Sequence, residues 1–282
     1  MIGAVIGDIV GSRFEGTRFQ QEPIELKNPV CDFTDDTVLT MAVAESLVRG
    51  HDPSDSYRRW WANYPNRGYG GWFSQWARNP GAQANESTSN GGAMRVSPIA
   101  LVCTGQDQVI EICRQYTKPT HNTAEALIGA EAIGVLTWFS KAEPDLSFLR
   151  TVATTDYYRL NQSIKDYEAD QKFELCCNDT VPKAITAVLE AKCFEDAMVN
   201  AVKIGGDVDT IACMAGGMAE NIWGIPPSLG EWAWEKLPSE MRGIIEDLYR
   251  AAGQKLAFNG MEKQEVLLKP PLFQRLKAAI GG

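Results

Sequence analysis

Two short acidic motifs in this 282-residue sequence each stand directly before an apolar run. The first, TDDT, covers residues 34–37, and the second, DVDT, covers residues 207–210. Thr34 is suited to cap the helix that follows it, and the helix dipole favours Asp35 and Asp36 in the first turn. Capping alone would explain the first motif, and it predicts solvated carboxylates without a partner.

The two motifs together point to a second interpretation. They supply four carboxylates and two threonine hydroxyls, which are hard oxygen ligands suited to Mg²⁺ or Mn²⁺ if the two helix starts meet in space. Uncompensated acids near a core are costly, so two such motifs favour metal binding over capping. Only His51 and His121 are present, so a metal site here must rely on oxygen ligands.

Three further features are candidates for chemistry. Glu15 follows the first apolar stripe and could act as a general base or position a water; a solvent-facing acid is the alternative. The segment SNGGAMR, residues 89–95, opens a helix, and backbone N–H groups at a helix start attract phosphate. An ordinary turn is the alternative there. His121 follows Thr120 before an expected helix, where capping or packing is the more common role.

The elements that must position these residues are helices. Apolar residues recur at helical spacing along the chain, and sustained period-two alternation is hard to find, which predicts a mostly α protein. Residues 63–92 are expected to form a long ordered loop with one short helix, of the kind that often carries function. No linker or repeat divides the chain, which predicts a single compact globular domain over residues 1–282. Helices are expected over about 2–10, 38–48, 96–103, 105–117, 123–140, 181–193, 195–204, 209–222 and 240–257.

Composition excludes several classes of protein. The formal net charge is −9, which makes nucleic acid unlikely as a primary partner and argues against anionic membrane surfaces. No run approaches the ~18 consecutive apolar residues of a membrane helix. The N-terminus lacks the basic region of a secretory signal, and seven cysteines without a CxxC pair favour reduced thiols. We therefore expect a cytoplasmic protein.

The order of the motifs carries a resemblance to a known family. The segments GAVIGDIVGSRFE, FTDDTVLTMAVAESL, SNGGAMRVSPIAL, TH and GGDVDTIACMAGGMA occur in the order and approximate spacing of the ADP-ribosylglycohydrolases. That family includes the dinitrogenase reductase-activating glycohydrolases. The resemblance covers roughly residues 1–226. It implies an all-α fold with a central cleft that holds two Mg²⁺ or Mn²⁺ ions beside bound ADP-ribose.

The resemblance also implies roles for individual residues. Glu15 matches a mobile acid that some members place over the metals, and it would act with Asp35 and Asp207 in catalysis. The metal ligands would be Thr34, Asp35, Asp36, Asp207, Asp209 and Thr210. The residues that hold ADP-ribose would be Asn90, Gly91, Gly92, Met94 and His121.

Some positions depart from the family pattern. Residues 86–89 read Glu-Ser-Thr-Ser where relatives carry glycine and an aromatic, which puts stacking of adenine or ribose by this loop in question. Val208 replaces a common Thr or Ala, with little expected effect because only the flanking acids would coordinate. Residues 176–182 resemble the part that lines the adenosine side of the site.

The implied reaction is metal-dependent hydrolysis of the glycosidic bond between ADP-ribose and an acceptor. The partners would be ADP-ribose and an ADP-ribosylated protein or other group. Two alternatives stay open: an inactive ADP-ribose-binding or structural protein with the same fold, and a metal-dependent phosphohydrolase of ADP-ribose derivatives. The acceptor, whether arginine, serine, a nucleobase or a small molecule, is left open by the sequence.

Overall fold

The computed structural model describes residues 1–18, 23–83 and 86–256. Within these ranges the chain forms fourteen α-helices, a 3₁₀ turn and a π turn, and it forms no β-strand. The prediction of an all-α fold is therefore confirmed. The elements are α1 (Ile2–Gly11), α2 (Asp35–Arg49), α3 (Pro53–Asn63), α4 (Gly71–Arg78), η1 (Asn90–Gly92), α5 (Ser97–Val102), α6 (Gln106–Thr117), α7 (Ala124–Ala142), α8 (Leu146–Val152), η2 (Ala153–Tyr157), α9 (Ile164–Asp170), α10 (Cys177–Leu189), α11 (Phe194–Ile204), α12 (Val208–Trp223), α13 (Pro227–Lys236) and α14 (Ser239–Ala251).

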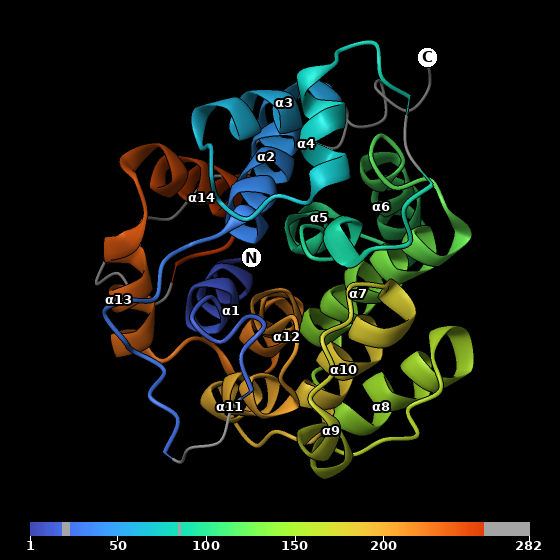
Figure 1. Ribbon diagram of the computed structural model, residues 1–282, viewed down its shortest axis with the longest axis vertical. Coiled ribbons are helices and arrows are strands. Elements are labelled where there is room, and N and C mark those ends of the chain that lie inside the picture. Colours follow the sequence, from blue (N-terminus) through green and yellow to red (C-terminus); the bar gives the residue numbers. More distant parts are fainter. Residues whose placement is uncertain (19–22, 84–85, 257–282) are drawn as a thin grey trace.

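Helices α1 and α12 form the centre of the molecule, and the other helices surround them (Figure 1). Every residue of α1 is buried, as are residues 208–219 of α12. Their backbones touch through glycines: a Cβ on Gly7 would lie 2.0 Å from the Ala212 carbonyl oxygen, and one on Gly3 would lie 2.2 Å from that of Gly216. Only residues without a Cβ permit this approach.

The packing of α1 against α12 decides where two acidic segments lie. Gly11, the last residue of α1, sits against the start of α12, because a Cβ there would lie 2.4 Å from the Asp209 Cα. The backbone N–H of Gly16 donates to the Gly206 carbonyl at 3.0 Å and holds the segment after α1 beside the segment before α12. Helix α2 packs on the same end of α1.

Most of the expected helices are confirmed, and two have wrong bounds. Helix α10 begins four residues before the predicted 181–193, because the helix continues across Pro182. The predicted 240–257 ends instead at Ala251, where Gly253 adopts φ +65° and the Gln254 N–H bonds back to the Tyr249 carbonyl. Four helices were not predicted: α3, α8, α9 and α13. The single domain predicted for residues 1–282 includes residues 257–282, which lie outside the described residues.

The glycine contact makes a testable prediction. Replacing Gly7 by Ala should lower the free energy of unfolding by about 2–4 kcal/mol, because the added methyl group meets backbone that cannot move aside. Gly243 is the matched control, since it lies inside α14 and a Cβ there meets nothing within 4 Å. Gly243→Ala should stabilise the protein by up to about 1 kcal/mol through helix propensity. Urea unfolding measures both, and equal effects of the two substitutions would contradict the packing argument.

Candidate metal and ligand site

Asp8 ties α1 to α2 at the centre of the site. Its carboxylate is fully buried and accepts four hydrogen bonds. The donors are the Thr34 N–H at 2.9 Å, the Thr34 hydroxyl at 2.6 Å, the Thr37 N–H at 3.0 Å and the Thr37 hydroxyl. Asp8 thereby fixes the first turn of α2. The sequence analysis did not assign it to the site.

The start of α2 carries the first acidic motif as predicted. Thr34 caps the helix, and its hydroxyl oxygen accepts the Asp36 N–H at 3.3 Å. Asp36 is only 2% exposed; its Oδ2 accepts the Thr210 hydroxyl at 3.2 Å, and its Oδ1 has no hydrogen-bond partner. Asp35 is half-buried, and its N–H donates to the Arg67 carbonyl at 2.7 Å. The solvated carboxylates that simple capping predicts are not found.

The start of α12 carries the second motif. Gly205 and Gly206 both have positive φ, +70° and +80°, which glycine adopts without strain. A Cβ on Gly206 would lie 2.3 Å from the Lys172 carbonyl oxygen, so the turn packs closely on the segment before α10. Asp207 stands at the N-cap position and accepts the Asn90 side-chain N–H at 2.6 Å. The loop that contains Asn90 is thereby connected to the acidic motif.

The two motifs meet in space. Ligand oxygens of Asp8, Asp36 and Asp209 lie within 4.8 Å of one another, and so do those of Glu15, Asp207 and Asp209. Asp209 belongs to both groups. Thr34 and Thr210 turn their hydroxyl groups to Asp8 and Asp36. Asp35 lies outside both groups but faces the adjoining cavity.

The electrostatics of the cluster favour a cation. Burial raises the pKa of Asp36 well above its usual range, and the neighbouring charges of Asp209 and Asp8 raise it further. Burial and the surrounding carboxylates raise the pKa of Asp35 and of Asp209 in the same way. Within the described ranges, none of the ion pairs involves a carboxylate of this cluster.

These residues fit a hard divalent cation. The donors are carboxylate oxygens, which Mg²⁺ and Mn²⁺ prefer. The buried Asp36 Oδ1 without a hydrogen-bond partner is an atom that such a cation would satisfy. Glu15 is exposed as a residue, yet its carboxyl group is partly desolvated, and this burial together with Asp207 and Asp8 raises its pKa. It stands at the open side of the cluster.

A cavity of about 320 Å³ adjoins the acids. Of the predicted ligand residues, it is lined by Asn90, Gly91, Met94 and His121. Gly92 does not line it: a Cβ there would meet the Thr117 Cγ2 at 2.5 Å, so this glycine packs against the end of α6. Gly92 therefore has a packing role in this structure, and its contact with a ligand stays a prediction.

Besides the predicted Met94, the apolar wall of this cavity includes side chains that were not predicted as site residues. Trp72, at the start of α4, is 71% exposed, and Phe173 and Leu175, in the segment before α10, are each about half exposed. Trp72 falls in the 63–92 stretch that was expected to carry function. The sequence pattern around Phe173 and Leu175 does not mark either of them as a site residue.

Residues 176–182, predicted to line the adenosine side of the site, do not border the cavity beside the acids. Cys176 forms a β-bridge with Ser89, and the chain then turns into α10. Asn178, Asp179 and Pro182 consequently line a separate cavity of about 230 Å³. The preceding residues, Phe173 and Leu175, reach the site instead.

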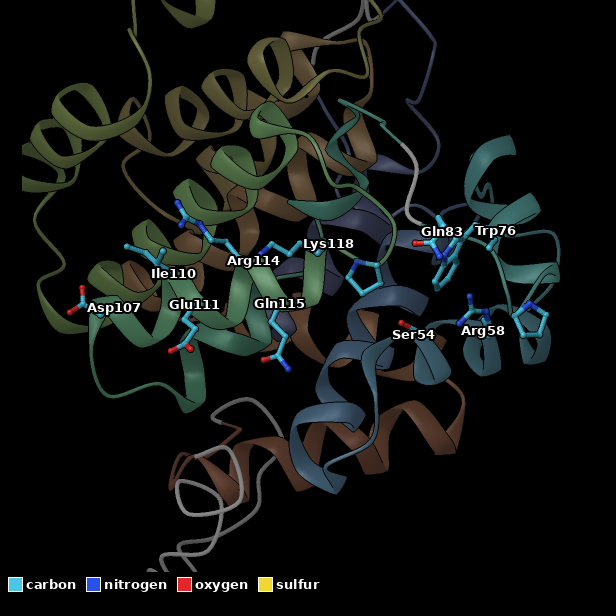
Figure 2. Close-up of a pocket in the computed structure, with 13 residues that line it drawn as sticks. Ser54, Arg58, Trp76, Gln83, Asp107, Ile110, Glu111, Arg114, Gln115 and Lys118 are labelled. Carbon is cyan, nitrogen blue, oxygen red and sulfur yellow. The ribbon is translucent and has the colours of Figure 1, made fainter. Parts of the chain in front are cut away.

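A larger groove, of about 860 Å³, lies elsewhere (Figure 2). Figure 2 shows Glu111 and Arg114 of α6, with Lys118 just after this helix, on one side of it. Arg58 of α3 and Trp76 of α4 lie on the other side. None of the clustered acids lines this groove. Arg58 lies 3.9 Å over the Trp76 ring. The wall of the groove is a mixture of basic, acidic and amide side chains. Size alone therefore does not locate the chemistry.

Comparison with known proteins identifies the family of this chain. The sequence profile of the ADP-ribosylglycohydrolase family matches residues 1–257. ADP-ribosylhydrolase ARH3 of Danio rerio is 24% identical, with 80% of this chain and 82% of that protein covered. ADP-ribosylarginine hydrolase Tri1 of Pseudomonas putida is 23% identical, covering 90% and 78%.

A solved structure described as an ADP-ribosylglycohydrolase-related protein complex has the same fold. It superposes with a TM-score of 0.69 at 24% identity, covering 89% of this chain and 95% of that chain. This chain is therefore an all-α protein whose carboxylates gather at the ends of its central helices. Within that class, the chain belongs to the ADP-ribosylglycohydrolase family. Family membership supports ADP-ribosyl hydrolase activity.

The raised pKa of Asp36 makes a prediction for the metal-free protein. The folded state keeps this proton at pH values where the unfolded chain, with an ordinary pKa of 3.8, has lost it. The folded state therefore binds more protons in that window, and the free energy of unfolding falls as the pH rises. Asp36→Asn should stabilise the metal-free protein by about 1–2 kcal/mol at pH 7.5 and flatten this slope.

Urea unfolding at pH 6.5, 7.5 and 8.5 measures the effect. His121 has the opposite effect on the pH dependence of the free energy of unfolding. Because burial lowers its pKa from 6.5 to about 3, this effect is confined to pH values around and below 6.5. Between pH 7.5 and 8.5 that contribution is small, and at every pH it is the same in the wild type and in Asp36→Asn. Asp107→Asn, in the exposed first turn of α6, is the control and should leave the slope unchanged. A variant at Asp36 less stable than the wild type at every pH would contradict the electrostatic argument.

Proposed function

We propose that this protein is a metal-dependent hydrolase that cleaves the glycosidic bond between ADP-ribose and a modified acceptor. The observation that carries the proposal is the meeting of Asp36, Asp207 and Asp209 around one end of a ligand-sized cavity. Carboxylates so close together are costly without a cation. The named relatives hydrolyse ADP-ribosyl linkages, which supports the same substrate class here.

Two Mg²⁺ or Mn²⁺ ions fit the donor set. One group of ligands would be Asp8, Asp36 and Asp209, and the other Glu15, Asp207 and Asp209. The predicted set of Thr34, Asp35, Asp36, Asp207, Asp209 and Thr210 is thus extended by Asp8. When bound, such ions orient ribose hydroxyls and activate a water as nucleophile.

The side chains of the protein have separate tasks in this reaction. Asn90, Gly91, Met94 and His121 border the cavity and would hold ADP-ribose with the anomeric carbon toward the acids. Glu15 is placed to take the proton of the attacking water or to return it to the leaving acceptor as the C–N or C–O bond breaks. Burial and the nearby acids Asp207 and Asp8 raise its pKa, which makes its carboxyl group better able to hold a proton during the exchange.

Asp35 and Asp207 are the other proposed catalytic acids. Asp35 faces the cavity from the first turn of α2, and Asp207 is held by the Asn90 amide.

A position in the cytoplasm belongs to the same proposal. It is supported by seven cysteines without disulfides, five of them buried. None of the described helices is long and apolar enough to cross a membrane.

Asp209→Asn tests the proposal because Asp209 belongs to both carboxylate groups. It should slow release of free ADP-ribose by 100-fold or more, about 2.7 kcal/mol of transition-state stabilisation. The assay follows free ADP-ribose from arginine-linked and serine-linked ADP-ribosylated peptides, with Mg²⁺, with Mn²⁺ and with EDTA. Asp107→Asn, in the first turn of α6, should retain full activity.

The outcomes separate the alternatives. EDTA should abolish release by the wild type, and full activity of Asp209→Asn would refute the assigned site. Phosphate release without free ADP-ribose would identify a phosphohydrolase. Calorimetric binding of ADP-ribose without turnover of either peptide, together with no binding of Mg²⁺ or Mn²⁺, would identify an inactive binding protein.

A further inference from the structure

Arg95 is a buried cation in the wall of the ligand cavity. Its side chain is 0% exposed and lies 4.1 Å over the Tyr57 ring. Its Nη2 donates to the Thr120 hydroxyl oxygen at 2.5 Å and to the Tyr116 carbonyl at 3.4 Å, while Nε and Nη1 have no hydrogen-bond partner. No carboxylate within the described ranges forms an ion pair with Arg95. Burying a charged guanidinium without a paired carboxylate is costly, which points to a role for Arg95 in the site.

A chain of hydrogen bonds connects Arg95 through Thr120 and His121 to Ser89. The Thr120 hydroxyl lies 2.8 Å from His121 Nδ1, and His121 Nε2 lies 2.9 Å from the Ser89 hydroxyl. Both ring nitrogens are therefore engaged. Ser89 and His121 line the cavity of the acidic cluster, and Gly91 lies flat against the ring, since a Cβ there would be 3.1 Å from His121 Cε1.

Proton counting gives this chain a direction. A guanidinium can only donate, so the Thr120 oxygen accepts from Arg95 and has one proton left to give. That proton goes to His121 Nδ1 at 2.8 Å rather than to the Thr117 carbonyl at 3.4 Å, because the shorter contact is the stronger hydrogen bond. The ring is neutral, as burial and the nearby Arg95 charge lower its pKa to about 3. Its single N–H is then on Nε2, and it donates to Ser89.

The direction matters for Ser89. A serine hydroxyl has one proton, and the opposite histidine tautomer would require it for Nε2. With Nε2 as donor, the Ser89 proton is directed to the Ser87 hydroxyl 2.8 Å away or to an oxygen in the cavity. ADP-ribose offers such oxygens in its diphosphate and ribose groups.

We propose that Arg95 is a positioning residue that acts through Thr120 to hold His121 in the Nε2–H tautomer, leaving the Ser89 hydroxyl as a hydrogen-bond donor to a ligand oxygen. The ligand part of this inference rests on the proposed function, whereas the tautomer does not. His121 has no free ring nitrogen and takes no part in proton transfer.

The tautomer is measured by ¹⁵N NMR of histidine-labelled protein without metal or ligand. The chain has two histidines, and exposed His51 provides an internal reference for a ring in exchange between tautomers. His121 should show a pyridine-type Nδ1 and a pyrrole-type Nε2 at neutral pH. A pyrrole-type Nδ1, or an imidazolium, would overturn the proposal.

Variants test the role of Arg95. Arg95→Met should release the ring into a mixture of tautomers, and Arg95→Lys, which keeps a donor, should retain the Nε2–H form. Thr120→Val interrupts the same chain and serves if Arg95→Met does not fold; Thr120→Ser is its matched control. An unchanged Nε2–H tautomer in both Arg95→Met and Thr120→Val would show that Arg95 does not set it.

Calorimetric titration with ADP-ribose tests the consequence for the ligand. Thr120→Val and Ser89→Ala should each weaken binding about 10-fold, the loss of one hydrogen bond. The double variant should bind no more weakly than Ser89→Ala alone, because both act through the same proton. Additive losses would overturn the link to Ser89. If the wild type binds no ADP-ribose, the ligand part fails with the proposed substrate, and the NMR result decides the tautomer separately.

Discussion

Contact between the backbones of α1 and α12 is the interaction on which the rest of the site depends. The contact requires glycine at positions such as Gly7 and Gly216, where a Cβ would lie 2.0 Å from a carbonyl oxygen of the opposite helix. Because the two helices lie so close, the end of α1 is pressed against the start of α12. A carboxylate on α1 and the acids that precede α12 then reach the same point. Side-chain packing at the usual interhelical distance of ~8–10 Å would leave these acids further apart.

The close approach of these buried acids lowers the free energy of unfolding of the metal-free protein. Asp8 is compensated by four hydrogen bonds, so its burial organises the first turn of α2. Asp36 has an oxygen without a partner, and its neighbours are other carboxylates. Burial nevertheless outweighs these hydrogen bonds and raises the pKa of Asp8, so Asp8 and Asp36 both oppose folding when ionised, until a cation binds. Retaining buried like charges without compensation is typical of a site kept for chemistry rather than for folding.

The sequence predicts the two acidic motifs and the helices that carry them, because TDDT and DVDT are local signals of helix starts. It does not predict Asp8, and the reason is physical. The apolar stripe of an amphipathic helix has a polar side facing solvent, and Asp8 falls outside that stripe. Helix α1 is buried on all sides, so a residue outside the stripe still points into the protein. Contacts across the fold, and not spacing, likewise decide which loop residues face the cavity: Gly92 packs against Thr117, and Asn178 borders a separate cavity.

The loop around Asn90 connects the two halves of the site. Its backbone is fixed from one side, where the Asn90 N–H donates to the Leu175 carbonyl and the Cys177 N–H donates to that of Thr88. Its side chains are fixed from the other, by Asp207 and by His121. A ligand that moves this loop would therefore shift a carboxylate of the cluster. The acids come from helix ends whose positions the core determines, whereas Trp72 and Phe173 come from connecting segments. Such segments change more readily than the core, so substitutions there can alter the wall of the cavity without moving the acids.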